Sequence, residues 1–577
     1  MKKYFLNLVS SHLIFFLISS FVILGLNLTP MVKQILHTPP GRTFALIHNN
    51  VQDFFFYESL MNEGAHGSLL TTNPYTTEPH RPSIIFAYFL WLGRLSKLFG
   101  LSYALSYHLT RIVLAILLLL AAYYVILLIK IPHPRLVFLF FLFASPLMHT
   151  INDTGKLTTV PYMNWWTGVD PIRRIAYLPH HMLGGLLLLI SIILIMKYIK
   201  IKQKKYLFLL TGLTIPMAFV HPPSLFIILI TLPVAVIIHQ LTSKLTKNAK
   251  QPHQVSNWSA SWRIGLLDNW VIGLFFYWFI GLLVLLIMVS QTNQGFPWSQ
   301  YITWESKLQF PLDKELLGAL GILTPFALLG VISALVLRKF NYILIACWLA
   351  VPLLLIPFAP YLNISNIRFI QGVPYLPLAI LAVLGIEVII SNLESLRPRR
   401  ISLGLKISKL HLKSKNWEKF IGLLGYWVIG LLFLVSTLPT FVWSLKDQIR
   451  EYWPIFGNVY LDNRLNSAFS FIDRSFPAKT VTLSTFYTGN YLPAFTNTRS
   501  FIGHFGYTYN IDEKQKQVQR FFENKMSSAE ASDFITNNKI ALIFQGPEEK
   551  PIYNNYLYPS ILKPIYDREE VTLYTLK

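Results

Sequence analysis

The stretch LSYHLTRIVLAILLLLAAYYVILLI, residues 105–129, decides the fold class of this chain. The 18 residues after Arg111 carry no charge, and a helix of about 20 apolar residues crosses a hydrocarbon core of roughly 30 Å. Comparable apolar runs recur along the 577 residues, of which 53% are hydrophobic and 13% charged. The sequence therefore predicts a polytopic α-helical membrane protein and excludes an ordinary soluble one.

About eleven of these runs are candidate transmembrane helices. The first follows Met-Lys-Lys, but its apolar part is too long for a signal peptide and lacks a small-residue cleavage site, so we interpret it as a retained helix. The expected spans lie at approximately 5–27, 105–129, 134–149, 181–199, 206–220, 224–240, 266–290, 316–337, 341–359, 370–391 and 420–443.

The net charge of +23 is explained by where the basic residues fall. If the N-terminus is cytoplasmic, most lysines and arginines before residue 444 lie in cytoplasmic loops, and most acids lie outside them, which is the positive-inside pattern. The charge thus predicts a multi-pass protein of the plasma (inner) membrane with its C-terminus outside, and it gives no reason to expect nucleic acid. No Gly-x-x-x-x-Gly-Lys-Ser/Thr loop occurs, which argues against a nucleotide-driven machine.

Three segments on the expected exterior side are too long to be turns, and irregular sequence of this kind usually carries function. They span residues 28–104, 150–180 and 291–315. Within the first, PSIIFAYFLWLGRLSKLFG (82–100) is apolar but carries Arg94 and Lys97. This pattern predicts a helix that lies in the membrane interface rather than crossing the bilayer.

The composition changes after residue 443, which divides the chain into a transmembrane domain (1–443) and an exterior soluble α/β domain (444–577). The second part has no run long enough to span a membrane. Strands are expected at TVTLSTF, KIALIFQG and EVTLYTL, and amphipathic helices at DEKQKQVQRFFENK and SSAEASDFITNN, the last with a serine N-cap.

The first exterior segment contains an acid among aromatics in VQDFFFYES (51–59). Near a membrane interface, Asp53 is costly to desolvate, so its presence needs a reason. One interpretation is a general base that deprotonates an acceptor nucleophile. The alternative is an N-cap of the helix that follows, since aspartate is a preferred capping residue. The two roles are compatible.

Several phrases of the chain together resemble the GT-C glycosyltransferases, a superfamily that includes protein O-mannosyltransferases, lipid A aminoarabinose transferases and oligosaccharyltransferases. The likeness covers most of the chain by layout and short phrases rather than by one diagnostic motif. The phrases are Asp53 with NPYTTEPHRPSIIFAYFLWLGRLSKLFGLSYALSYHLTRI (73–112), MAFVHPPSLFIILI (217–230), FPWSQYITWESKLQFPLDKELLGALGIL (296–323), RFIQGVPYLPLAILAVLGI (368–386) and STFYTGNYLPAFTNTRSFIGH (484–504).

This resemblance implies transfer of a sugar from a polyprenyl-phosphate donor, with inversion, to a glycan, lipid or protein acceptor at the exterior face. Asp53 would activate the acceptor. Many relatives place a second acid beside the first, whereas here Phe54 follows Asp53 and Glu58 lies about 140° around a helix. A second acid is therefore sought in the second exterior segment, at Asp153 or Asp170, and a divalent cation is left open.

Cations and polar side chains at the exterior ends of the spans are candidate substrate-binding groups, because arginine matches phosphate oxygens well. Arg368 at the mouth of the tenth span could instead be an interfacial arginine, and Arg173 and Arg174 could form a solvated pair. The expected spans contain no His-x₃-His pattern, so the sequence does not predict a zinc site. The candidates are Arg368, Arg173, Arg174, Arg81, Tyr57, His180 and His181, while Arg111 is more readily explained as a packing partner.

Two other functions remain open on the sequence. A transporter or flippase for lipid-linked glycan would show inverted repeats and charges at mid-membrane, and neither is visible. A catalytically inactive relative that binds envelope glycan or protein is compatible with the missing second acid beside Asp53.

Overall fold

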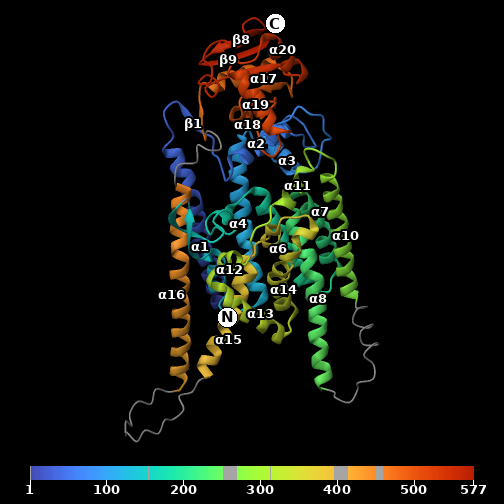
Figure 1. Cartoon of the computed structure of the whole chain (residues 1–577). Helices are drawn as coiled ribbons and strands as arrows, with labels where there is room; N and C mark the ends of the chain where they lie inside the picture. Colours follow the sequence, from blue (N-terminus) through green and yellow to red (C-terminus); the bar gives the residue numbers. More distant parts are fainter. Residues whose placement is uncertain (1, 154, 251–268, 312, 396–413, 450–458) are drawn as a thin grey trace. The chain divides into compact units, whose positions relative to one another are not determined.

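The computed structural model describes residues 2–153, 155–250, 269–311, 313–395, 414–449 and 459–577, and Figure 1 shows its helices and strands. The chain forms two compact units. Unit 1 comprises Met1–Asn27, Arg111–Leu285 and Glu305–Asp447, and unit 2 comprises Leu28–Thr110, Leu286–Trp304 and Gln448–Lys577. The segment expected as the first exterior loop thus belongs to the same unit as the C-terminal residues.

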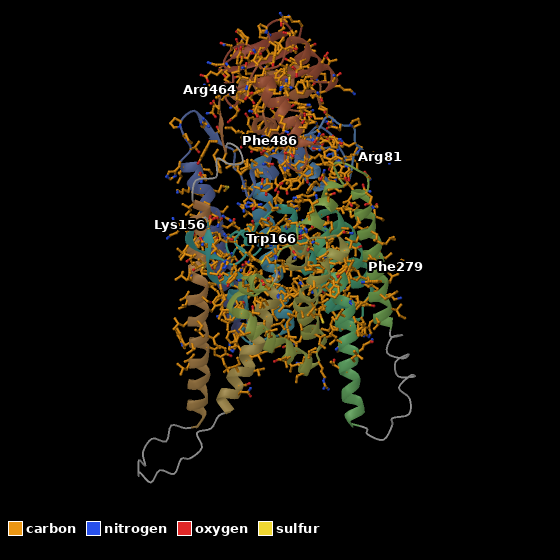
Figure 2. All side chains as sticks on the ribbon, in the orientation of Figure 1. Arg81, Lys156, Trp166, Phe279, Arg464 and Phe486 are labelled. Carbon is orange, nitrogen blue, oxygen red and sulfur yellow. The ribbon has the colours of Figure 1, made fainter. Side chains whose placement is uncertain are left out.

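Nine helical segments in the described part of the chain are long and apolar enough to cross a membrane. Apolar side chains on their outer faces are exposed, as at Phe275 and Phe279 (Figure 2), and such faces suit lipid better than water. The prediction of a multi-pass α-helical membrane protein is confirmed. The segments are carried by α1 (Lys2–Leu36), α4 (Tyr103–Ile129), α6 (Pro179–Ile201), α8 (Pro222–Lys250), α10 (Asn269–Thr292), Lys314–Leu337 with α12 (Lys314–Leu320) and α13 (Thr324–Leu337), α14 (Phe340–Leu355) extended to Leu362, α15 (Tyr375–Ser395) and α16 (Ser414–Ile449).

The expected span over 134–149 is wrong in its second half. Helix α5 covers only Pro134–Phe143, and at about 1.5 Å per residue it is about 15 Å long, half of what a span needs. Ser145 precedes Pro146, and the residue before a proline disfavours helical backbone. The chain then forms a hairpin of β2 (Met148–Asp153) and β3 (Lys156–Pro161).

The expected span over 206–220 corresponds to α7 (Lys204–Val220), whose 17 residues lie at the lower limit for crossing a bilayer. The first expected span, 5–27, continues as a single helix to Leu36. The number of membrane crossings therefore stays a prediction. The helical character of these two segments is confirmed.

The C-terminal residues of unit 2 form the expected α/β domain. A five-stranded sheet has the order β6-β5-β7-β9-β8, with β5 parallel to β6 and β7, and β9 antiparallel to β7 and β8. Ser527 caps the last helix by accepting a hydrogen bond from the Glu530 backbone N–H, as predicted. The elements are β5 (Val481–Leu483), β6 (Arg499–Ser500), β7 (Leu542–Gln545), β8 (Leu562–Arg568), β9 (Val571–Leu576), α17 (Leu465–Ser475), α18 (Phe486–Phe495), α19 (Ile511–Phe522) and α20 (Ser528–Asn537).

Helices α2 (Val51–Ala65) and α3 (Ala87–Phe99) of the first loop cross with their backbones in contact. A Cβ atom at Gly93 would lie 1.8 Å from the Met61 carbonyl oxygen, and one at Gly64 would lie 2.1 Å from the Leu90 carbonyl oxygen. Only glycine permits so close an approach. The crossing fixes the direction of α2, and hence of the acid near its start.

Helix α3 explains the mixed character of the 82–100 stretch. Its two cations contact the C-terminal end of α2: Arg94 donates to the carbonyls of Gly67 and Ser68, and Lys97 donates to that of Ala65. The helix dipole favours positive charge there. The stripe of Trp91, Leu95, Leu98 and Phe99 is exposed. An interfacial position for α3 remains a prediction that this arrangement suits.

Candidate active site

Asp53 stands in the first turn of α2, but it does not cap the helix. The N-cap is Asn50, whose side-chain oxygen accepts hydrogen bonds from the backbone N–H groups of Gln52 (2.9 Å) and Asp53 (3.3 Å). The Asp53 carboxylate is 42% exposed and favourably placed near the positive end of the helix dipole. Of the two roles considered for Asp53, helix capping is performed by Asn50 instead.

The partner of Asp53 is His504, which follows β6 in the C-terminal domain. The Nε2 atom of His504 lies 3.3 Å from Oδ1 of Asp53. The backbone N–H of Gly506 donates to Nδ1 at 3.0 Å. Because Nδ1 accepts, a neutral His504 carries its proton on Nε2 and donates it to the carboxylate. One carboxylate oxygen is therefore held, and Oδ2 is not part of this contact.

The Asn-Pro-Tyr turn of the first loop seats His504. The Tyr75 ring stacks on the imidazole with centroids 5.6 Å apart. Asn73 accepts the backbone N–H of Tyr75 and donates to the Tyr507 carbonyl, while the Tyr75 hydroxyl donates to the Asn490 carbonyl. The turn thus links the first loop to the C-terminal residues on both sides of His504.

Glu58, the next acid on α2, is in a different environment. Its side chain is buried, and its Oε2 atom has no hydrogen-bond partner among the described residues. Burial raises the pKa of Glu58 to about 8, against the hydrogen bond from the Ala104 backbone, which lowers it. A carboxyl that stays largely protonated at neutral pH is a poor metal ligand, so Glu58 does not supply the missing second acid.

In unit 1, Arg368 lies just before α15, in the short helix η4 (Asn366–Ile370). Its guanidinium forms a two-pronged ion pair with Glu305: Nε donates to Oε2 at 2.8 Å, and Nη2 contacts Oε1. The Ser365 backbone N–H also donates to the Glu305 carboxylate. Both side chains are mostly buried, at 24% and 13% exposure. A fork of this kind matches a carboxylate or a phosphate equally well.

Two buried histidines, His180 and His221, and the half-buried His181 lie within the electrostatic reach of Arg368. His180 and His181 lie in the first turn of α6, and His221 joins α7 to α8. The ring centroids of His181 and His221 are 4.3 Å apart, and those of His180 and His181 are 4.5 Å apart. His221 Nδ1 is hydrogen-bonded to the Ser224 hydroxyl at 2.8 Å.

Several buried polar atoms in the segments that carry Arg368 and these histidines lack partners within the described part of the chain. They include both amide atoms of Gln371, the Ser365 hydroxyl and Nε2 of His221; each of these side chains is less than a tenth exposed. Gln371 follows Arg368 by three residues, and its backbone N–H donates to the Arg368 carbonyl. Because buried polar groups without partners are costly, this arrangement is typical of a site that receives a polar ligand.

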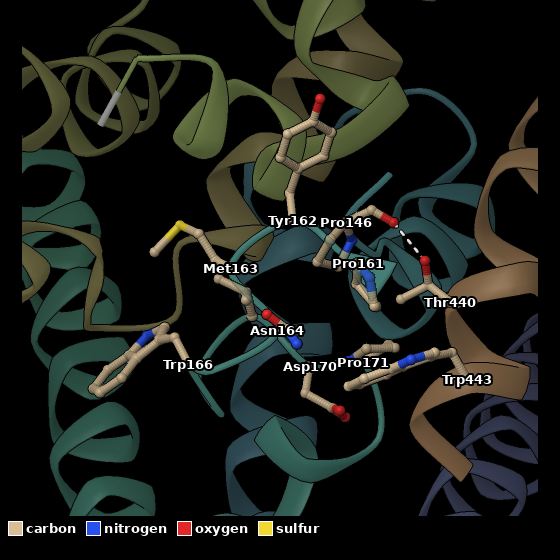
Figure 3. Close-up of a pocket in the computed structure, with 11 residues that line it drawn as sticks. Pro146, Pro161, Tyr162, Met163, Asn164, Trp166, Asp170, Pro171, Thr440 and Trp443 are labelled. Carbon is tan, nitrogen blue, oxygen red and sulfur yellow. Dashed lines mark hydrogen bonds between the residues drawn. The ribbon is translucent and has the colours of Figure 1, made fainter. Parts of the chain in front are cut away.

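The two acids of the second exterior segment differ in their surroundings, since Asp170 is engaged in structural contacts and Asp153 is not buried. Asp170 accepts the backbone N–H groups of Ile172 and Arg173 on one oxygen and the Ser444 hydroxyl on the other. Figure 3 shows Asp170 beside Pro171 and Trp443 at a small hollow. Asp153 is exposed near the turn of the β2–β3 hairpin.

The other predicted cations and the tyrosine have individual positions. Arg173 pairs with Asp447 at 2.6 Å. Arg174 donates to the carbonyls of Phe141, Leu142, Ala144 and Val169, which closes the end of α5. Arg81 is exposed on the first loop (Figure 2). Tyr57 is buried, with its ring stacked on Phe89 at 4.2 Å.

Sequence reasoning missed Glu305 and Gln371, and it set His504 aside with the other exterior histidines. All three lie in phrases that carry the family resemblance, which was the available signal. Among the described residues, no group of three or more His, Cys, Asp or Glu side chains could hold a metal ion.

No known family model matches this chain, and no curated protein matches its sequence. Among solved structures, it is similar to the oligosaccharyltransferase AglB from Archaeoglobus fulgidus in complex with an inhibitory peptide and a dolichol-phosphate, with 12% identity, a TM-score of 0.49, and coverage of 91% of this chain and 69% of AglB. It is also similar to ArnT from Cupriavidus metallidurans bound to undecaprenyl phosphate, with 11% identity, a TM-score of 0.43 and 98% coverage of both chains.

Another AglB structure, in complex with zinc and sulfate, has 10% identity and a TM-score of 0.46. Both proteins are GT-C membrane glycosyltransferases, the class that the sequence resembles.

Proposed function

We propose that this protein transfers a sugar from a polyprenyl-phosphate donor to an acceptor at the exterior membrane face. The observation that carries the proposal is the polar group around Arg368: the buried Gln371 amide, three residues further on, has no partner among the described residues, and three histidines at the starts of α6 and α8 lie within the electrostatic reach of the guanidinium. A cation among hydrogen-bonding groups at the ends of apolar helices suits a phosphate attached to a lipid chain. The sequence resemblance supplies the reaction class.

In this structure, the Glu305 carboxylate occupies the guanidinium fork of Arg368. A phosphodiester or phosphate could replace this carboxylate because it presents the same paired oxygens. The Gln371 amide offers a donor and an acceptor for sugar hydroxyls. Asp170, Arg173 and Arg174 are engaged in structural contacts, so we do not assign them to the donor.

Asp53 is the proposed general base. Its Oδ2 atom removes a proton from the acceptor nucleophile, which forms a bond to the anomeric carbon as the bond from that carbon to the phosphate oxygen breaks. The configuration inverts, and polyprenyl phosphate leaves as an anion. No covalent enzyme intermediate is needed, and every step uses side chains of this chain.

The test is transfer of radiolabelled sugar from a panel of undecaprenyl-phosphate sugars in liposomes that contain the full chain and a bacterial envelope extract as acceptor. Loss of a general base typically costs 10²–10⁴-fold in rate. The Asp53→Asn variant should therefore transfer sugar more slowly by about that factor while it still binds undecaprenyl phosphate. Arg368→Gln should weaken that binding. Arg568→Gln removes an exposed arginine from β8 and is the matched control.

Full turnover by Asp53→Asn would assign the base to another residue. No turnover by the native chain with any donor, although undecaprenyl phosphate binds, would reject the transferase and favour a binding or transport protein. Equal undecaprenyl phosphate binding by Arg368→Gln and the native chain would remove the assigned phosphate site.

A further inference from the structure

We propose that His504, supplied by the C-terminal domain, is the positioning residue for Asp53, so that the first loop alone does not make a competent base. This inference rests on the proposed function and adds a residue to it. It assigns the C-terminal domain a direct part in the reaction, beyond covering the site or recruiting an acceptor.

The contact has a defined direction. The Gly506 backbone N–H occupies Nδ1, so the Nε2 proton of neutral His504 points to Oδ1 of Asp53 at 3.3 Å. A hydrogen bond to one oxygen of a carboxylate fixes the rotation of the whole group. The other oxygen, Oδ2, is then presented in one orientation on a side chain that is 42% exposed.

The imidazole itself is held firmly. Its side chain is 9% exposed, and it is enclosed by the rings of Tyr75, Phe56 and Tyr507, with centroids 5.6, 5.9 and 4.6 Å away. Asp53, by contrast, is in the first helical turn and is half open to solvent. The better-ordered partner therefore orients the more open one, and not the reverse.

The backbone around His504 is tied to the same turn of α2. The Phe505 backbone N–H donates to the Gln52 side chain at 3.0 Å, and the Gln52 carbonyl accepts from Asn490 at 3.5 Å. Two consecutive residues of α2, Gln52 and Asp53, thus both contact the C-terminal domain. This geometry would be expected if the domain sets the position of the carboxylate.

The experiment compares His504→Ala, His504→Gln and Asp53→Asn, singly and combined, in full-length protein reconstituted as above with the undecaprenyl-phosphate sugar that the native chain uses. A misplacement of about 1 Å at a reacting group costs up to about 10²-fold. We expect His504→Ala to lower kcat about 10- to 100-fold with little change in the KM for the donor. Glutamine places an amide N–H near the position of Nε2, so His504→Gln should recover most of the loss.

Two readouts separate positioning from mere structural support. Added imidazole should partly restore His504→Ala, because it fills the vacated site with the same donor. In the Asp53→Asn background, His504→Ala should cause no further loss, since residues that act as a unit are not additive. Tyr509→Ala, which removes an exposed ring from the same loop, is the control and should keep the native kcat.

The inference is overturned if the native chain turns over but His504→Ala matches it, if the two substitutions multiply their effects, or if Tyr509→Ala falls as far as His504→Ala. It is also overturned if His504→Ala has the same melting temperature as the native protein, but neither added imidazole nor the His504→Gln substitution recovers kcat. Absence of turnover in the native chain would instead remove the proposed function, and this inference with it.

Discussion

Replacing Glu58 with glutamine should change how the stability of the protein depends on pH. Burial raises the pKa of Glu58 from its ordinary 4.5 to about 8. Below pH 4.5 the carboxyl is protonated in both the folded and the unfolded chain. As the pH rises, the unfolded chain loses this proton first, and the contribution to stability is lost as the pH rises through about 8.

The size of the effect follows from the shift. One pKa unit corresponds to about 1.4 kcal/mol, so the native chain should lose about 5 kcal/mol of stability from this group between pH 4.5 and 8. Glutamine has nearly the same shape, keeps an oxygen for the Ala104 N–H and cannot ionise. The stability of Glu58→Gln relative to the native protein should therefore increase as the pH rises, and the difference should level off above pH 8.

The assay is thermal unfolding of nanodisc-embedded protein, followed by tryptophan fluorescence from pH 5 to 9. The difference between the melting temperatures of Glu58→Gln and native protein should be smallest at pH 5. Glu513→Gln makes the same substitution at an exposed position on α19 and should show no such divergence. Curves for Glu58→Gln and the native chain that run parallel across this range would refute the reasoning.

Three further substitutions test contacts within one unit or the other. Gly93→Ala should lower the melting temperature by an amount equivalent to about 1–3 kcal/mol, because its Cβ would lie 1.8 Å from the Met61 carbonyl oxygen; a neutral result would contradict the close helix crossing. Arg174→Met leaves the carbonyls at the end of α5 without their donor and should expose the single buried cysteine to a thiol probe at a lower temperature. Lys514→Met removes the 2.8 Å partner of Glu78, and its destabilisation should shrink as the pH falls and Glu78 is protonated; equal loss at pH 3.5 and 7 would show that packing, not charge, is responsible.

The parts of the fold that the sequence predicted are those set by local patterns. Apolar runs and period-2 strands depend on near neighbours, so the sequence predicts the membrane class and three of the five strands in the C-terminal sheet, β5, β7 and β9. Helix α5 shows the limit. Its early end depends on Ser145–Pro146, which was visible, and on Arg174, whose guanidinium returns to carbonyls about 30 residues earlier in the chain.

The candidate site was predictable only in part. Asp53 and Arg368 were identified as residues, but their partners were not, because the pairs are 451 and 63 residues apart in the chain. Neither pair has a spacing that a sequence pattern could reveal. The capping question at Asp53 was also undecidable from the sequence, since Asn50 and Asp53 are both good caps and the choice depends on where α2 begins.

Two of the three acids of α2, Asp53 and Glu58, show why environment, rather than residue type, assigns their roles. Asp53 faces solvent on one side and the Nε2 proton of His504 on the other, so it is a carboxylate with one oxygen engaged. Glu58 is five residues further along, about 140° around the helix, where it is buried and keeps its proton. Glu63, the third acid, is mostly buried and pairs with Lys479, so the helix presents a single open carboxylate. Because Nε2 of His504 holds Oδ1 of this acid, we propose that the C-terminal domain sets its orientation.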